Sequence, residues 1–276
     1  MFVRNLFKYS SFFFLFMLPV TALSSFVYCP KQFYATYVLK EKVVPNKAMV
    51  LGSVKHRAFD IFFSKEESVV SSLSSDSDVF SVFRDAFVSA LRKSVVSNRA
   101  SLRSVGVSLD DAFRLSLPAV LSEAKSRAGI VDSFLSEGVF GSELWNSLTP
   151  KVRSEFSIKS DALGLKGRVD YVEYYPDFLV PVELKSGSMP DSGVWDHHRV
   201  QAVAYALLFE DVFGASCSRA VVYYVDSGVR REVVLNPFLR DWVKDVVRQA
   251  NDVIASGVVP EGCGRPSCVF CSRPDL

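Results

Sequence analysis

Long apolar segments, internal repeats and a strong excess of one charge are all missing from this 276-residue chain. Its apolar run from Phe12 to Val20 is too short to cross a bilayer, which takes about 20 residues. The formal net charge is +2, from 32 basic and 30 acidic residues. This balance neither demands nor excludes nucleic acid, because phosphate binding needs a local cluster of basic residues.

Cysteine is also scarce, and an odd count of five is poorly suited to a framework of disulfides. Three of the five, Cys263, Cys268 and Cys271, lie within nine positions of one another near the C-terminus. Clustered thiols are typical of metal sites in a reducing compartment, so we expect a cytoplasmic protein. By count alone, Cys29 or Cys217 could supply a fourth ligand, for either an iron–sulfur cluster or zinc.

The N-terminal segment has two interpretations. Arg4 and Lys8 precede the apolar run and small residues follow it, which is the outline of a signal peptide. Alternatively, residues 1–20 hold a mis-annotated extension and the true start is Met17. The stretch TALSSFVYCPKQFYATYVL, beginning at Thr21, is expected to form an amphipathic helix.

Hydrophobic periodicity changes along the chain from helical to strand-like spacing after Pro150. Pro118 is expected to interrupt a helix before that point. A closing helix is bounded by Asn236 as its cap, Pro237 at its first position and Gly257 after its last turn. The chain therefore reads as an N-terminal extension (1–20), N-terminal helices (21–63), a serine-rich helical insertion (64–150), an α/β core (151–257) and a cysteine-bearing C-terminal segment (258–276).

The segment GRVDYVEYYPDFLVPVELKSG carries the most informative chemistry. A turn centred between Pro176 and Asp177 pairs residues whose numbers sum to 353. In that register Asp170 faces Glu183 across an antiparallel pair, at a Cβ separation of about 4.5–5.5 Å. Two carboxylates so close repel each other unless something positive lies between them. Lys185 follows Glu183 by two positions, so side-chain alternation puts it on the same face.

This arrangement suits a divalent cation, Mg²⁺ or Mn²⁺, that orients and acidifies an attacking water. Lys185 would position that water or stabilise charge that develops on a phosphate. The alternative is a surface ion pair between Glu183 and Lys185, with Asp170 capping a turn. Apolar residues on both strands favour the cation, because unpaired acids are costly in buried strands.

The downstream segment DHHRVQAVAYALLFE is expected to be a helix with Gln201 and Tyr205 on one face. Both could point into the site, or Tyr205 could be a core residue and Gln201 solvated. His197 and His198 are expected to be ordinary residues of the first turn. His56, taken alone, is more typical of a half-buried histidine than of a ligand.

The combined motifs resemble the CRISPR-associated Cas-four exonucleases, iron–sulfur members of the RecB-like PD-(D/E)xK nucleases. The resemblance rests on YCPKQFY, GSVKH, GRVD, VELKSG, QAVAY and the terminal C-x4-C-x2-C, in the family's order, over residues 22–60 and 152–273. It implies an α/β fold with a restriction-endonuclease-like mixed sheet flanked by helices. The helical insertion would make this chain a larger variant, with a cysteine-bound cluster joining its N- and C-terminal segments.

The resemblance also implies roles for particular residues. The catalytic Mn²⁺ or Mg²⁺ would be bound by His56, Asp170, Glu183 and the backbone carbonyl of Leu184. Lys185 would be the catalytic lysine, Gln201 and Tyr205 would position DNA, and Glu155 would be a further acidic residue near the site. The cluster, a 4Fe-4S cluster by resemblance, would be held by Cys29, Cys263, Cys268 and Cys271, which leaves Cys217 as a buried small residue.

The implied activity is degradation of DNA from single-stranded ends, with 5′ to 3′ polarity, during CRISPR spacer acquisition. The implied partners are single-stranded DNA ends and the Cas-one and Cas-two integrase proteins, with room for an oligomer and no membrane. Three alternatives stay open on the residues alone: a RecB-like DNA repair nuclease, a catalytically silent iron–sulfur DNA-binding scaffold, and a secreted zinc protein.

Overall fold

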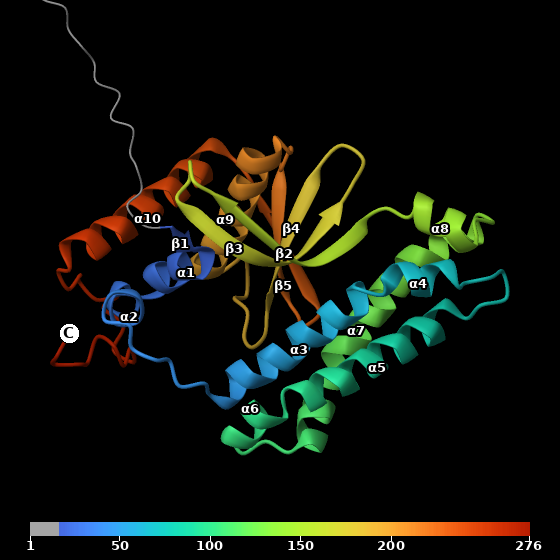
Figure 1. Cartoon of the computed structure of the whole chain (residues 1–276), viewed down its shortest axis with the longest axis horizontal. Coiled ribbons are helices and arrows are strands. Elements are labelled where there is room, and N and C mark those ends of the chain that lie inside the picture. Colours follow the sequence, from blue (N-terminus) through green and yellow to red (C-terminus); the bar gives the residue numbers. More distant parts are fainter. Residues whose placement is uncertain (1–16) are drawn as a thin grey trace, which may run out of the picture.

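The computed structural model describes residues 17–276, and most of the signal-like or extension segment lies outside this range. Within it, helices cover both faces of a six-stranded mixed sheet, which confirms the expected fold class (Figure 1). No helix of the described range is long and apolar enough to cross a membrane. The elements are β1 (Leu18–Pro19), α1 (Val20–Tyr28), α2 (Pro30–Phe33), the π-helical turn η1 (Tyr34–Val38), α3 (Lys47–Phe63), α4 (Glu66–Ser71), α5 (Val79–Ser97), α6 (Arg99–Ser104), α7 (Leu109–Ser136), α8 (Gly141–Ser147), β2 (Lys151–Ser160), β3 (Leu165–Tyr174), β4 (Leu179–Lys185), α9 (Asp196–Phe213), β5 (Arg219–Tyr224), β6 (Val229–Val234) and α10 (Pro237–Ser256).

Strand β3 is the only strand of the described sheet with three neighbours. β2 runs antiparallel along the whole of one edge of β3. On the other edge β4 pairs with residues 171–174, and β1 pairs in parallel with residues 165–166. Tyr171 lies opposite Val182, so the register that sums to 353 is confirmed. Residues 167–170 face no strand on that edge, and this gap is called the fork below.

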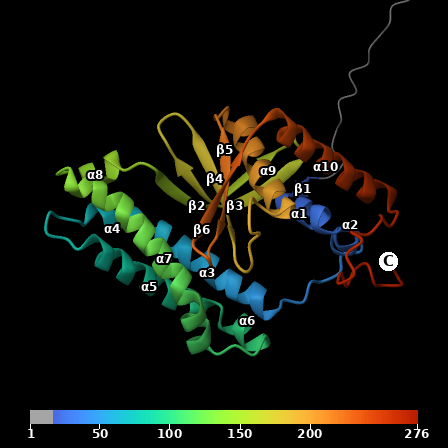
Figure 2. The same ribbon diagram turned by 180° about the vertical axis from the view of Figure 1, so that it is seen from behind.

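Side chains that alternate along the strands build one core on each side of the sheet. Val182 and Leu184 of β4 pack with α3, α5 and α7, whereas Val222 and Tyr224 of β5 pack with α1, α9 and α10. Both views show this division, with α9 and α10 on one side of the sheet and the long helices α3, α5 and α7 on the other (Figure 2). The helices of 64–150 therefore share a core with α3 and the sheet.

The prediction of a single helix from Thr21 is wrong, because the helix is interrupted at Cys29. This residue is extended, with φ −161° and ψ 115°, between α1 and α2. Pro30 follows it, and a proline disfavours the helical conformation in the residue before it. Cys29 is consequently buried at the junction of two helices.

The expected interruption at Pro118 is also wrong, because α7 continues through it. Proline removes one backbone hydrogen bond, but the buried Ala119 and Val120 keep this turn packed in the core. The bounds of the closing helix are confirmed. The side chain of Asn236 accepts the N–H of Leu239, and Gly257 ends α10 with a left-handed φ of 64°.

The buried ion pair between Arg127 and Glu66 gives a test of this packing. Arg127 Nη2 lies 3.2 Å from Glu66 Oε2 and donates to Pro150 O at 2.7 Å. Arg127→Ala leaves a buried, unpaired carboxyl, so we expect the free energy of unfolding to fall by about 3–5 kcal/mol in urea titrations. The exposed Arg114→Ala should cost less than about 1 kcal/mol. Equal losses in the two variants would contradict the structural role of the pair.

Candidate functional site

Asp170 lies in the fork and bridges it with its carboxylate. Its Oδ2 accepts the backbone N–H of Leu184 at 2.7 Å, which takes the place of a missing ladder bond between β3 and β4. Its Oδ1 lies 2.8 Å from Nδ1 of His56, which α3 brings in from the other side. Asp170 and His56, 114 positions apart in the sequence, are therefore in direct contact.

Glu183, Lys185 and Gln201 form the second half of the site. The Lys185 Nζ donates to Glu183 Oε1 at 2.9 Å and to Gln201 Oε1 at 2.6 Å. The contact confirms that Glu183 and Lys185 lie on one face of β4, as alternation predicts. Gln201 is 3% exposed, so the solvated alternative for this residue is wrong.

The carbonyl of Leu184 is oriented toward the fork. The N–H and C=O of one residue in a strand point to the same side, and the N–H of Leu184 points to Asp170. The carbonyl of the next residue, Lys185, accepts from Val225 on the β5 side, as strand alternation requires. Leu184 is therefore placed to offer its oxygen to an ion in the fork.

Tyr205 is a core residue that lies against β3. It is 2% exposed, and its hydroxyl donates to the carbonyl of Arg168 at 2.9 Å. A Cβ on Gly167 would lie 2.7 Å from the Tyr205 ring, so only glycine allows this close approach. Its contact is with the backbone of β3, so its predicted part in positioning DNA would act through the strand that carries Asp170.

A second glycine lets α3 approach the end of β4. A Cβ on Gly52 would lie 2.6 Å from the hydroxyl of Ser186. One helical turn later His56 reaches the fork, which explains physically why a glycine precedes the histidine by four positions in GSVKH. These two close approaches explain why GRVD and GSVKH each begin with a glycine.

A cavity of about 790 Å³ opens above Asp170, Leu184 and Lys185. Glu155 and Arg168 line it and form an ion pair with Nε and Oε2 2.5 Å apart. Glu155 has a left-handed φ of 52°, which is rare for a non-glycine residue and typical of functional sites. The rest of the lining residues are Thr21, Met49, Gly52, Ser53, His56, Arg57, Ser97, Asn98 and Ser186.

Four of the lining residues that sequence reasoning missed are polar or charged. Ser97 and Asn98, at the junction of α5 and α6, bring the helical insertion to the wall of the cavity. Arg57 follows His56 on α3, and Arg168 adjoins Gly167 in the GRVD motif. The arginines neighbour motif residues, which is a signal that could have found them, whereas no local pattern marks Ser97 or Asn98.

Burial and mutual charge set the pKa values in the site. Burial alone would raise the pKa of Asp170, but the charge and hydrogen bond of His56 and the N–H of Leu184 hold it below its ordinary value. Burial would lower the pKa of His56, but Asp170 raises it overall. Burial raises the pKa of Glu183 to about 6, partly offset by Lys185. The site therefore pairs two carboxyl groups, Asp170 and Glu183, with two basic groups, His56 and Lys185.

The donors present fit a hard divalent cation, since they combine carboxylate and carbonyl oxygens with one imidazole. The ligand atoms of His56, Asp170 and Glu183 do not converge as tightly as those of the cysteines described next. Each carboxylate instead bonds a neighbouring base, His56 or Lys185. His56 contacts Asp170 through Nδ1, so it would bind an ion through Nε2 while the carboxylate holds the other ring nitrogen, as is common for metal-bound histidines.

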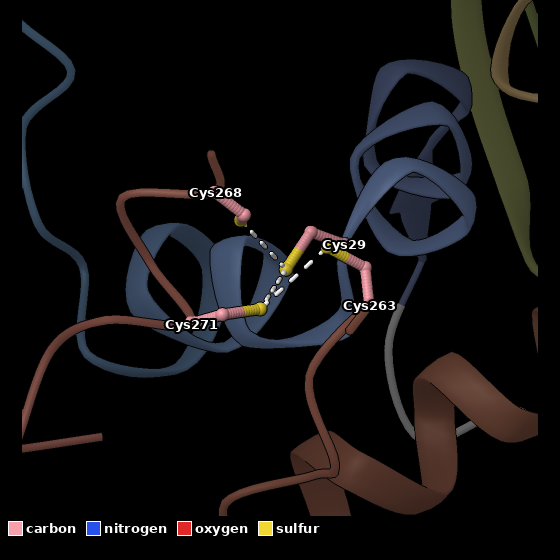
Figure 3. A group of neighbouring side chains, drawn as sticks. All are labelled: Cys29, Cys263, Cys268 and Cys271. Atoms are coloured by element: carbon pink, nitrogen blue, oxygen red, sulfur yellow. Dashed lines mark hydrogen bonds between the residues drawn. The ribbon is translucent and has the colours of Figure 1, made fainter. Parts of the chain in front are cut away.

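Four cysteines meet where the C-terminal segment crosses the start of α2 (Figure 3). Cys29, Cys263, Cys268 and Cys271 place all four Sγ atoms within 4.8 Å of one another. Cys217 is buried in the core beneath α9 and takes no part. The structure thus brings together the set that the resemblance implies.

The environment of these thiols differs from one to the next. Burial raises the pKa of Cys29 to about 11, whereas hydrogen bonds from Arg265, first from its backbone, lower the pKa of Cys263 to about 6. A Cβ on Gly262 would lie 2.6 Å from the Sγ of Cys271, so a glycine is needed beside the group. A bound metal would hold all four as thiolates.

Comparison with known proteins places the chain in a family. A family model described as the PD-(D/E)XK nuclease superfamily matches residues 18–275. This chain belongs to the PD-(D/E)XK nuclease superfamily.

Within that superfamily it is similar to proteins named CRISPR-associated exonuclease Cas4. That of Thermoproteus tenax is 26% identical over 102 residues, which cover 37% of this chain and 53% of the relative. That of Rhodospirillum rubrum is 29% identical over 121 residues, or 43% of this chain and 36% of the relative. A Cas4/endonuclease Cas1 fusion of Myxococcus xanthus is 36% identical over 106 residues, or 37% of this chain and 19% of the relative. The matches span about half or less of these relatives, and they support the Cas-four resemblance.

The pKa values predict how cation binding depends on pH. Glu183, with a pKa of about 6, binds a proton as the pH falls from 7.5 to 5.5, and the pKa of His56, raised by Asp170, makes protonation of the imidazole a further competitor of the ion. Protonated groups cannot coordinate, so we expect Mn²⁺ affinity to fall by roughly tenfold or more over this interval, as measured by calorimetry. His56→Asn should bind more weakly at pH 7.5 and show a shallower pH dependence. Equal affinity of the wild type at both pH values would contradict the assignment of these ligands.

Proposed function

We propose that this protein is a divalent-metal-dependent DNA exonuclease that degrades single-stranded ends. The observation that carries this proposal is the meeting of Asp170, Glu183 and Lys185 beside the fork, with His56 opposite. Membership of a nuclease superfamily and the exonuclease names of the relatives support it. The 5′ to 3′ polarity and the role in CRISPR spacer acquisition rest on the resemblance to the Cas4 family.

The residues of the fork have two proposed roles: some bind the cation, and Lys185 contacts the phosphate or the attacking water. Asp170, Glu183, His56 and the Leu184 carbonyl would hold Mg²⁺ or Mn²⁺, which would lower the pKa of a water ligand and offset phosphate charge. Lys185 uses two of its three N–H donors on Glu183 and Gln201. The third is left for a phosphate oxygen or the attacking water.

The arrangement around Lys185 also fixes where its charge lies. Both partners are buried, so the ammonium is held rigidly between β4 and α9 before a substrate arrives. A donor fixed in advance stabilises developing negative charge without a cost of reorganisation. Gln201 acts here as a positioning residue, since it contacts the lysine.

We infer that the four cysteines hold an iron–sulfur cluster, a 4Fe-4S cluster by resemblance to the family. Three Sγ–Sγ distances are 3.5, 3.6 and 3.8 Å. Tetrahedral zinc would hold thiolates about 3.8 Å apart, whereas iron and sulfide between the thiolates of a cluster require them to open outward. The donor set fits both, so metal analysis decides between them.

The proposed setting is the cytoplasm, where reduced thiols persist. The proposed partners are Cas-one and Cas-two integrase proteins, because some relatives are named as fusions of Cas4 with endonuclease Cas1. Such a fusion holds the two activities on one chain, and a separate chain would meet its partner through a surface contact.

The nuclease proposal predicts the effect of removing single groups of the fork. Lys185→Met should slow degradation of end-labelled single-stranded DNA with Mn²⁺ by about 10²- to 10³-fold, because one preorganised donor is lost. Glu183→Gln should abolish detectable degradation and weaken Mn²⁺ binding. The matched control is Glu232→Gln, since Glu232 is an exposed glutamate outside the fork.

Labels at the two ends and a circular substrate complete this experiment. Loss of the 5′ label first, with no cleavage of circular single strands, is expected of a 5′ to 3′ exonuclease. Cleavage of circles would mean an endonuclease instead. A wild type that leaves all DNA intact with Mn²⁺ and Mg²⁺, while its cysteine site is loaded, would favour the silent scaffold.

The cysteine site predicts a second, independent result. Protein purified without oxygen should contain about four iron atoms and equivalent acid-labile sulfide per chain. Cys268→Ser should lose both, and Cys217→Ala should retain them, because Cys217 lies away from the group. One zinc ion per chain with no sulfide would contradict the cluster and establish a zinc site.

A further inference from the structure

A group of neighbouring side chains, three exposed and one half-buried, joins the residues beside the cysteine site to the start of α9. It consists of Tyr28, Trp195, His197 and Arg265, and is called the aromatic platform below. Tyr28 and Trp195 are 40% and 44% exposed. The ring of His197 joins them, at centroid distances of 5.0 Å to Tyr28 and 6.5 Å to Trp195. Three aromatic rings from α1 and the start of α9 are thus contiguous.

Arg265 adds a positive charge to the platform. Its guanidinium carbon lies 3.8 Å from the centroid of the Tyr28 ring, and its Nη2 donates to the Tyr28 carbonyl. This contact is a cation–π interaction, which leaves the outer side of an exposed arginine available to an anion. The platform therefore combines aromatic faces with a cation at the surface.

The fold itself does not account for the exposed aromatic rings. Trp195 occupies the N-cap of α9, where Ser, Thr, Asp or Asn usually supplies a capping oxygen, and it makes no side-chain cap. Single exposed aromatic residues are ordinary, but a contiguous exposed group is typical of a binding surface.

The platform lies one helical turn from Gln201, the residue that contacts the lysine of the nuclease site. His197 precedes Gln201 by four positions on α9, which is about 6 Å along the helix axis. Gln201 in turn accepts a hydrogen bond from Lys185. Burial, followed by the charges of Lys185 and Arg265, lowers the pKa of His197 to about 4, so its ring is neutral at pH 7.

We propose that the aromatic platform stacks the unpaired bases of a nucleic acid strand and thereby sets which phosphodiester reaches Lys185. Aromatic faces bind every base, and an adjacent cation binds the backbone, which is the recurrent chemistry of single-strand sites. The separation of one helical turn between His197 and Gln201, which contacts Lys185, suits a nucleotide next to the one cleaved. This inference rests on the proposed function and deepens it.

The cysteine site holds the platform in place. Tyr28 directly precedes Cys29, and Arg265 Nε donates to Cys263 Sγ at 3.3 Å. Two of the four platform residues are thus fixed by the residues that would bind the metal. The platform gives the cysteine site a physical role in binding the strand.

The test compares binding of oligonucleotides with and without bases. Fluorescent single-stranded dT oligomers and abasic oligomers of equal length are titrated by anisotropy, with Ca²⁺ in place of Mn²⁺ to prevent cleavage. The wild type should bind the dT oligomer more tightly than the abasic one. Trp195→Ala and Tyr28→Ala should each weaken dT binding by roughly 5- to 150-fold and leave abasic binding nearly unchanged. Trp195→Phe should restore most of the preference.

Phe238→Ala is the matched control, because Phe238 is 84% exposed on α10, outside the platform. Its preference for bases should equal that of the wild type. Platform variants that keep the full preference would overturn the proposal, as would a wild type that binds both oligomers equally.

Degradation assays with Mn²⁺ separate this proposal from the nuclease proposal. A wild type that degrades DNA, but binds dT and abasic oligomers equally well, refutes the platform proposal and leaves the nuclease proposal standing. A wild type whose preference depends on Trp195, but which never degrades DNA, supports the platform and refutes the nuclease.

Discussion

The site depends on one hydrogen bond, from the backbone of Leu184 to the carboxylate of Asp170. β4 and β1 share one edge of β3 and leave residues 167–170 without a strand partner there. A buried N–H needs an acceptor, and Asp170 supplies it in place of a ladder carbonyl. The position of this carboxylate is consequently set by the backbones of two strands, and the same constraint aims the Leu184 carbonyl into the fork.

Charge balance explains how so many ionisable groups are buried together. Glu183 and Asp170 repel each other, and burial alone would favour their neutral forms. His56 and Lys185 supply compensating positive charge from α3 and β4, and each makes a direct contact with one acid. Breaking one of these pairs would leave a buried charge without a partner, which is far costlier than loss of a surface pair.

Features that depend on the alternation of side chains along a strand, or on the residues of a turn, could be predicted from the sequence. The turn at Pro176 and Asp177 fixes the pairing of β3 with β4, and alternation then places Lys185 beside Glu183. Burial of Gln201 could not be predicted in this way. α9 is apolar on most of its surface, so periodicity does not show which face meets the sheet.

Tertiary packing decided the features that sequence reasoning missed or misread. Pro118 stays within α7 because its neighbours are buried, although the residue itself disfavours a helix. Glu155 adopts a left-handed conformation beside the fork, which no pattern in β2 indicates. Ser97 and Asn98 reach the cavity only because α5 packs along α3. Each depends on contacts between segments far apart in the chain.

The cysteine site is the main restraint on the C-terminal segment. Within 258–276 only Cys268 is buried, so the hydrophobic effect contributes little to holding this segment. The pair of Arg273 with Glu41 is partly exposed, and such surface ion pairs contribute little to stability. The thiols must therefore supply most of the attachment. Their loss would release Arg265 from the surface of Tyr28 while both cores of the sheet stay intact, so in the proposed arrangement the cysteine site acts on strand binding and not on the chemistry of the fork.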